Sequence, residues 1–173
     1  MRAFYTERGG KNQSEAVREL LRYAIREVYG AEMPNIAKTP DGKPYFPERT
    51  DIHFSLSHSK KYVMCAVADC PVGADMEEER TVRDGVPERV CSVRELEEFE
   101  FFELWVLKES FIKFKGRLTA NMREMEFLHR DGEIVAPECG VRAALYVPKP
   151  GLHAAVCSIG ELPTEMEYVA WKF

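Results

Sequence analysis

Val72-Gly73-Ala74-Asp75-Met76-Glu77-Glu78 is the stretch of sequence that carries most information about the fold. Residues 72–77 predict a β-strand, in which successive side chains point to opposite faces. Asp75 and Glu77 then share one face, and Ala74 and Met76 share the other. Paired carboxylates suit Mg²⁺, which takes one or two of them and completes its shell with phosphate and water. An ordinary strand with one solvated face has the same pattern, so both interpretations stay open from this stretch alone.

Helical and strand patterns alternate in blocks around this stretch. An apolar stripe predicts a helix over residues 14–29, capped by Ser14 and ended by Gly30. Residues 33–51 predict a long loop, and the apolar runs 52–56 and 62–68 predict two strands joined by a polar turn.

Beyond residue 78, a helix in two parts is expected at 92–98 and 101–115. Further strands are expected at 125–129, 141–147, 152–159 and 168–171.

The order of helix, strands, helix and strands predicts an α+β fold. We expect one domain of two similar halves, approximately residues 1–80 and 81–173, related by a pseudo-twofold axis. Each half would be a small antiparallel sheet packed on a helix. The apolar runs at 62–67 and 153–158 are faintly alike, which is weak support for an internal duplication.

Composition and charge exclude several classes of protein. The 173 residues are 45% hydrophobic and carry a net charge of −5. Nucleic acid is not expected as a partner, because it needs a strongly basic face. No apolar run approaches the ~20 residues of a membrane helix, and the first residues lack a secretory signal. Five widely spaced cysteines favour reduced thiols in the cytoplasm over a disulfide framework or a zinc site.

A second polar cluster lies in the expected helix 101–115. Trp105, Glu109 and Lys113 are spaced four residues apart and therefore line one helix face. A surface ion pair between Glu109 and Lys113, worth about 0.3–0.5 kcal/mol, would explain the spacing. Alternatively, Glu109 is a third metal ligand or a general base, and Lys113 neutralises a phosphate or a leaving group.

A third cluster is the turn Ser57-His58-Ser59. A turn dense in hydroxyl and backbone N–H groups can hold a phosphate, with His58 as a donor. An exposed histidine without a function is the plain alternative. A Ser–His hydrolase pair is disfavoured, because the two residues are sequence neighbours and no GxSxG elbow surrounds them.

In their order and spacing, these motifs resemble the Sfp-type 4′-phosphopantetheinyl transferase superfamily. The family pattern reads Gly-Lys-Pro, Ser-His-Ser, Gly-x-Asp-x-Glu and Trp-x-x-Lys-Glu-x-x-x-Lys. The matching stretches are residues 42–44, 57–59, 73–77 and 105–113, with an apolar strand at 62–68, and Gly116 and Leu118-Thr119 follow. The resemblance covers residues 42–119 well and the C-terminal strands loosely.

The resemblance implies a monomeric, magnesium-dependent enzyme of the holo-acyl-carrier-protein synthase type. It would move the phosphopantetheine arm of coenzyme A onto a serine of an acyl, peptidyl or aryl carrier protein, releasing 3′,5′-ADP. It implies Asp75, Glu77 and Glu109 as metal ligands. The residues implied to bind coenzyme A are Lys43, Ser57, His58 and Lys113.

The resemblance also implies catalytic roles for Glu109 and Lys113. Ser92-Val93-Arg94-Glu95 resembles the family's Ser-x-x-Glu, which makes Glu95 a second candidate base. About forty residues precede Gly42, fewer than in longer members, whose extra segment carries basic residues for the 3′-phosphate. Candidate substitutes are Arg2, Arg8 and Lys11, although surface solvation explains each of them better.

Two other classes of function stay open. A magnesium-dependent phosphohydrolase could use the same three carboxylates, but the Ser-His-Ser and Lys-Glu motifs would then be unexplained. A non-catalytic module could bind coenzyme A or a carrier domain, but such a module has no need for an acidic metal site.

Overall fold

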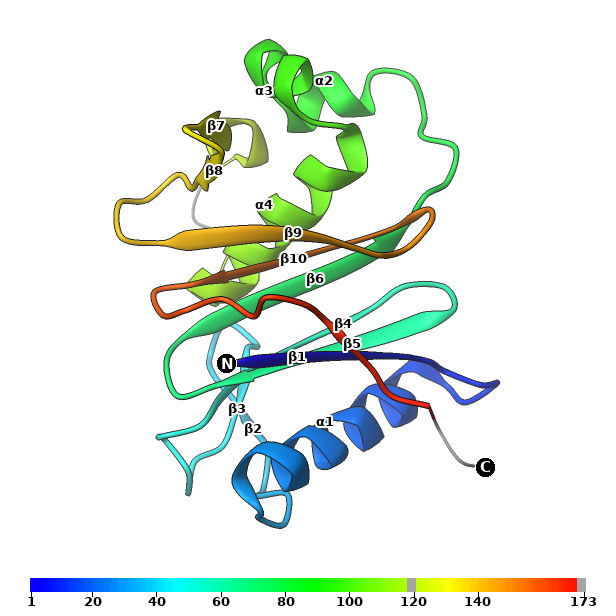
Figure 1. Ribbon diagram of the computed structural model, residues 1–173, viewed down its shortest axis with the longest axis vertical. Helices are drawn as coiled ribbons and strands as arrows, with labels where there is room; N and C mark the ends of the chain where they lie inside the picture. Colours follow the sequence, from blue (N-terminus) through cyan, green and yellow to red (C-terminus); the bar gives the residue numbers. More distant parts are fainter. Residues whose placement is uncertain (118–120, 171–173) are drawn as a thin grey trace.

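Two β-sheets stacked between two helices make up the centre of the computed structural model, which describes residues 1–117 and 121–170 (Figure 1). The first sheet has the order β11-β1-β5-β4 and the second has the order β6-β10-β9-β8-β7. Helix α1 (Gln13–Tyr29) covers the outer face of the first sheet, and α4 (Phe101–Lys115) covers the outer face of the second. The predicted α+β class is confirmed.

The first sheet is built from β1 (Arg2–Glu7), β4 (His53–His58), β5 (Tyr62–Ala68) and β11 (Glu167–Tyr168). Strand β5 pairs antiparallel with both β1 and β4, and the short β11 pairs parallel with β1. The C-terminal strand therefore joins the N-terminal sheet. A separate two-stranded ribbon, β2 (Ala37–Lys38) with β3 (Pro44–Tyr45), lies within the expected long loop.

The second sheet is built from β6 (Val72–Glu78), β7 (Leu128–Arg130), β8 (Glu133–Val135), β9 (Arg142–Lys149) and β10 (Leu152–Ser158). Strand β6 follows β5 in the chain but pairs antiparallel with β10, so the chain changes sheets after β5. Two short helices, α2 (Val86–Val90) and α3 (Val93–Glu98), and the 3₁₀ turn η1 (Met122–Glu124) flank α4.

Three apolar cores hold these layers together. One lies between α1 and the first sheet, and another lies between α4 and the second sheet. The middle core joins the two sheets and is rich in small side chains: Ala3, Ala66, Ala68, Ala74 and Ala154. Small residues on both faces allow the sheets to approach closely while still excluding water.

Most predicted elements are confirmed, and some details of the expectation are wrong. Helix α1 is capped by Asn12, whose side chain accepts from Glu15 N, and not by Ser14; Gly30 ends the helix as expected. The strand expected at 125–129 begins only at Leu128, because residues 122–124 form the 3₁₀ turn. Strand β1 was not expected at all. The Leu118-Thr119 motif and residue 171 of the last expected strand lie outside the described residues.

Within the described ranges, no helix combines the length and the apolarity that crossing a membrane requires.

Candidate active site between the second sheet and α4

One face of β6 is directed at α4. Ala74 and Met76 pack into the core between the sheets, so Gly73, Asp75 and Glu77 project from the opposite face toward the helix. A Cβ atom on Gly73 would lie 2.0 Å from the backbone oxygen of Ser110, so only glycine permits this close approach. The predicted sharing of one face by Asp75 and Glu77 is therefore the arrangement found.

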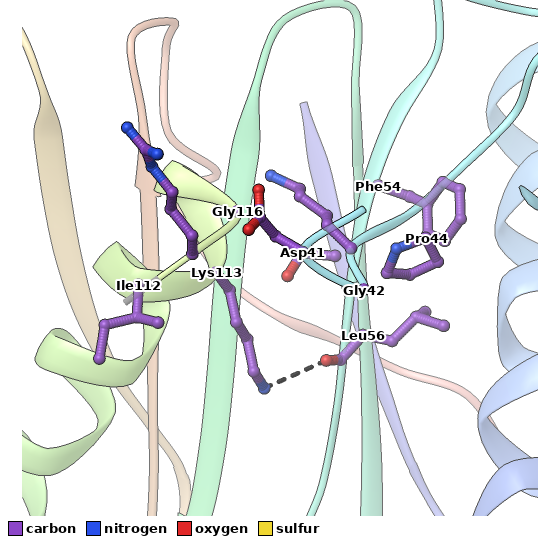
Figure 2. Close-up of a pocket in the computed structure, with 11 residues that line it drawn as sticks. Asp41, Gly42, Pro44, Phe54, Leu56, Ile112, Lys113 and Gly116 are labelled. Carbon is purple, nitrogen blue, oxygen red and sulfur yellow. Dashed lines mark hydrogen bonds between the residues drawn. The ribbon is translucent and has the colours of Figure 1, made fainter. Parts of the chain in front are cut away.

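Asp75 is the centre of a polar cluster. Its Oδ1 accepts a hydrogen bond of 2.6 Å from Ser57 Oγ on β4 and an ion-pair contact of 2.6 Å from Lys113 Nζ on α4. Lys113 also donates to the backbone oxygen of Leu56 at 3.1 Å (Figure 2). Asp75 is buried and Lys113 is partly exposed, so this contact joins both sheets and the helix at the edge of solvent.

Glu109 lies beside the two carboxylates of β6. Burial raises its pKa above the usual value, and the negative charges of Asp75 and Glu77 raise it further, while Lys113 opposes them. Glu77 forms an ion pair of 2.6 Å with Arg80. The three carboxylates are thus electrostatic neighbours. Among the residues that the structure describes, however, no three His, Cys, Asp or Glu side chains are already arranged to hold a metal ion.

Alternating serines of β4 and of the turn that follows it connect the first sheet to the segment around β6. Ser55 Oγ accepts from Ala74 N at 2.9 Å, and Ser57 Oγ accepts from Met76 N at 3.2 Å. Ser59 Oγ donates to Glu78 at 3.0 Å. The alternation Ser-x-Ser-x-Ser is visible in the sequence, but its partner strand is not. Ser57 therefore positions Asp75 directly, a role that the sequence did not suggest.

A cavity of about 310 Å³ opens beside Lys113 (Figure 2). Its lining includes Lys43, Phe54, Leu56 and Arg117, with Gly42 and Pro44 of the Gly-Lys-Pro motif. Lys43 Nζ donates to the backbone oxygens of Val72 and Phe114, and burial lowers its pKa to about 8. The cavity therefore combines apolar walls with cationic side chains from two motifs that are distant in the sequence.

The other two candidates lie in different surroundings. His58 is exposed at the end of β4, where the strand turns toward β5. Glu95 is completely buried at the start of α3, where its carboxylate accepts from Ser92 N and Phe127 N. It also pairs with Lys108 Nζ at 2.6 Å. These partners occupy both carboxylate oxygens of Glu95, and none of them belongs to the cluster around Asp75.

No family model matches the chain. The chain is 28% identical over 172 residues to the 4′-phosphopantetheinyl transferase Sfp of Bacillus subtilis (strain 168), an alignment that covers 88% of the chain and 77% of that relative. It is 37% identical over 110 residues to the 4′-phosphopantetheinyl transferase psf-1 of Bacillus pumilus, covering 57% of the chain and 47% of that relative.

A third relative has the same description. The 4′-phosphopantetheinyl transferase gsp of Aneurinibacillus migulanus is 32% identical over 123 residues, covering 61% of the chain and 51% of that relative. By class, the similar proteins are transferases. More particularly, all are named 4′-phosphopantetheinyl transferases, and this confirms the resemblance to the Sfp-type superfamily that the motifs indicated.

Proposed function

We propose that the protein is a 4′-phosphopantetheinyl transferase. It would transfer the phosphopantetheine arm of coenzyme A to a serine hydroxyl of an apo carrier protein and release 3′,5′-ADP, as holo-acyl-carrier-protein synthases do. The observation that carries this proposal is the meeting of Asp75 and Glu77 on β6 with Glu109 and Lys113 on α4. The names of the relatives support the same activity.

The donor set fits a divalent cation such as Mg²⁺. Asp75, Glu77 and Glu109 supply hard carboxylate oxygens, and Glu109 is destabilised in its charged form by the other two. A cation would relieve that repulsion. To bind the ion, Asp75 would release the ammonium group of Lys113, and Glu77 would release the guanidinium group of Arg80. When bound, the ion would supply charge neutralisation at the diphosphate of coenzyme A.

The remaining chemistry is assigned to two side chains of α4. Glu109, whose pKa is raised by burial, is suited to accept the proton of the carrier serine hydroxyl. As the serine oxygen bonds to phosphorus, the bond from phosphorus to the 3′,5′-ADP oxygen breaks. Lys113, released from Asp75, would hold the departing phosphate. Positioning and charge stabilisation therefore account for most of the rate enhancement.

The nucleotide end of coenzyme A would occupy the cavity beside Lys113. Lys43 and Arg117 offer cationic groups there, and Phe54 and Leu56 offer apolar contact for a base. His58, exposed at the end of β4, would donate to a phosphate, while Ser57 would act through Asp75. Glu95 stays only a formal candidate as a base, because its oxygens already have buried partners.

The two halves are proposed to be related by a pseudo-twofold axis, with a division near residue 80 in a single domain. Each half pairs a helix with a mostly antiparallel sheet, α1 with the first and α4 with the second. Strand β6 belongs by its pairing to the second sheet, although it precedes residue 80.

A monomer is proposed because one chain supplies both halves. A cytoplasmic location is proposed from the five unpaired cysteines.

Intact-mass spectrometry of carrier proteins tests the proposal. The purified protein is incubated with coenzyme A, Mg²⁺ and a panel of apo acyl, peptidyl and aryl carrier proteins. We expect one carrier to gain the mass of a phosphopantetheine group, and we expect the gain to vanish with a chelator and in Glu109→Gln. Glu97→Gln, which removes an exposed carboxylate from α3, is the matched control and should retain transfer.

Two results would contradict the proposal. Release of inorganic phosphate from coenzyme A without a carrier would indicate a phosphohydrolase. Tight binding of coenzyme A without transfer to any carrier in the panel would favour a non-catalytic binding module.

A further inference from the structure

His153 on β10 is a buried histidine with one ring nitrogen unused. It is 8% exposed, and its Nε2 lies 2.7 Å from Oε1 of Glu79. Within the described residues, its Nδ1 is the one buried side-chain nitrogen or oxygen without a hydrogen-bond partner. Leaving a buried polar atom unpaired is unfavourable, so a ligand that pairs with it gains affinity.

The tautomer follows from the partner of Nε2. A carboxylate accepts hydrogen bonds and does not donate them, so Nε2 carries the proton that it shares with Glu79. In the neutral ring, Nδ1 then presents a lone pair. The missing partner is therefore a donor, such as a hydroxyl or an amide N–H group.

His153 stands beside the proposed cation site. In the pairing of β10 with β6, it lies directly opposite Glu77, and side chains at such positions project from the same face. Its ring stacks on Phe102 of α4 at 6.2 Å between centroids. Arg80, which pairs with Glu77, has its guanidinium carbon 5.9 Å from the centre of the same Phe102 ring.

A cavity of about 480 Å³ opens at this point. Its lining includes His153, Phe101, Phe102, Arg80, Val82 and Pro87, together with two glutamates. None of these residues lines the cavity beside Lys113. One cavity thus contains Lys113, the partner of Asp75, and the other contains His153, which lies opposite Glu77. Only one of the two is needed for a nucleotide.

We propose that this second cavity binds the end of the phosphopantetheine arm nearest the diphosphate, and that His153 Nδ1 accepts a hydrogen bond from its hydroxyl group. The inference rests on the proposed function. That end of the arm carries one hydroxyl and a dimethyl-substituted carbon, which match one buried acceptor and a wall of aromatic and aliphatic side chains. Glu79 acts as the positioning residue that holds the ring in the accepting tautomer.

Calorimetric titration of the full chain with coenzyme A and with 3′,5′-ADP tests this proposal, because only the first ligand has the arm. His153→Gln can keep the contact with Glu79 but loses the acceptor at Nδ1. His153→Asn places a carbonyl oxygen near the Nδ1 position and loses the contact with Glu79. We expect His153→Gln to weaken coenzyme A binding on the order of tenfold and to leave 3′,5′-ADP binding within about twofold. His153→Asn should bind coenzyme A more tightly than His153→Gln does.

A measurement on the unaltered protein guards against misfolding of the variants. A coenzyme A analogue whose arm lacks the hydroxyl should bind the wild type on the order of tenfold more weakly than coenzyme A itself. Equal binding of the analogue, or equal losses for both ligands in His153→Gln, would overturn the inference. If the inference is overturned but the wild type still transfers the arm to a carrier protein, the proposed function stands without the inference. If the wild type neither binds coenzyme A nor transfers, both fail.

Discussion

Two lysines five residues apart on α4 each pair with a carboxylate at 2.6 Å, but in opposite surroundings. Lys108 and Glu95 are both 0% exposed, and Lys108 Nζ also donates to the backbone oxygens of Met122 and Met125. Lys113 is 30% exposed and shares Asp75 with a single serine. A buried pair with every group satisfied holds the fold together, whereas a pair at the edge of solvent can exchange partners and take up substrate.

The largest effect is expected from breaking the buried pair. Lys108→Met leaves the Glu95 carboxylate buried without its counter-charge, and we expect the free energy of unfolding to fall by about 3–5 kcal/mol. Urea denaturation followed by circular dichroism measures this loss. Adding Glu95→Gln removes the stranded charge but keeps an acceptor for Ser92 N and Phe127 N, so the double variant should recover part of it. A loss below about 1 kcal/mol in Lys108→Met would show that the pair is not structural.

The pair at the edge of solvent should show the reverse pattern. Lys113→Met leaves the buried Asp75 bonded to Ser57, so we expect it to lower stability by less than Lys108→Met does, and to reduce phosphopantetheine transfer by about 10²–10³-fold. Lys115→Met is the matched control. Lys115 lies on the same helix, but its ion pair of 2.6 Å is with Glu138, which does not belong to the cluster around Asp75. Steady-state transfer rates and urea midpoints are measured for both variants. Transfer at the wild-type rate in Lys113→Met would remove this lysine from the mechanism.

The smallest effect concerns Glu109, which lies between the two lysines. Because burial and the neighbouring carboxylates raise its pKa, its charged form is less stable in the folded protein than in the unfolded chain. That cost exists above the raised pKa and disappears below the unfolded pKa of ~4.3. Without added magnesium, Glu109→Gln should therefore raise the melting temperature at pH 7 by about 1–3 °C.

Differential scanning fluorimetry between pH 7 and pH 4 measures this difference. The gain in melting temperature should shrink as the pH falls, since the wild-type carboxyl group then becomes neutral as well. A Glu109→Gln variant that melts below the wild type at pH 7 would mean that the charged form of Glu109 is not destabilised in the folded protein. Glu97→Gln, on the exposed face of α3, should show no comparable gain at any pH.

The fold was predictable wherever local periodicity dominates. Helix α4 and strand β5 occupy the expected residues, because a helical apolar stripe and a continuous apolar run are local signals. Strand β1 was missed although four of its six residues are buried, because its pattern is too short and too mixed to stand out. The strand expected at 125–129 is observed at Leu128–Arg130, so its end was placed to within one residue and its start was three residues too early.

The candidate site was predictable only in its parts. Alternation in β6 placed Asp75 and Glu77 together, and spacing on α4 related Glu109 to Lys113. Neither pattern could show that Ser57 would bond to Asp75, or that Glu95 would be buried against Lys108. His153 gave no signal, since a single histidine in an apolar strand is common in a core.

The sequence by itself determined the elements, the faces that their side chains share and the order of the motifs, because these depend on residues a few positions apart. Only the tertiary structure decided that β6 leaves the first sheet to pair with β10, which sets His153 opposite Glu77. It also decided that α4 lies close enough to Gly73 for its two charged residues to face the strand. Such pairings depend on the packing of whole layers, and local periodicity carries no information about which distant surface will cover a given face.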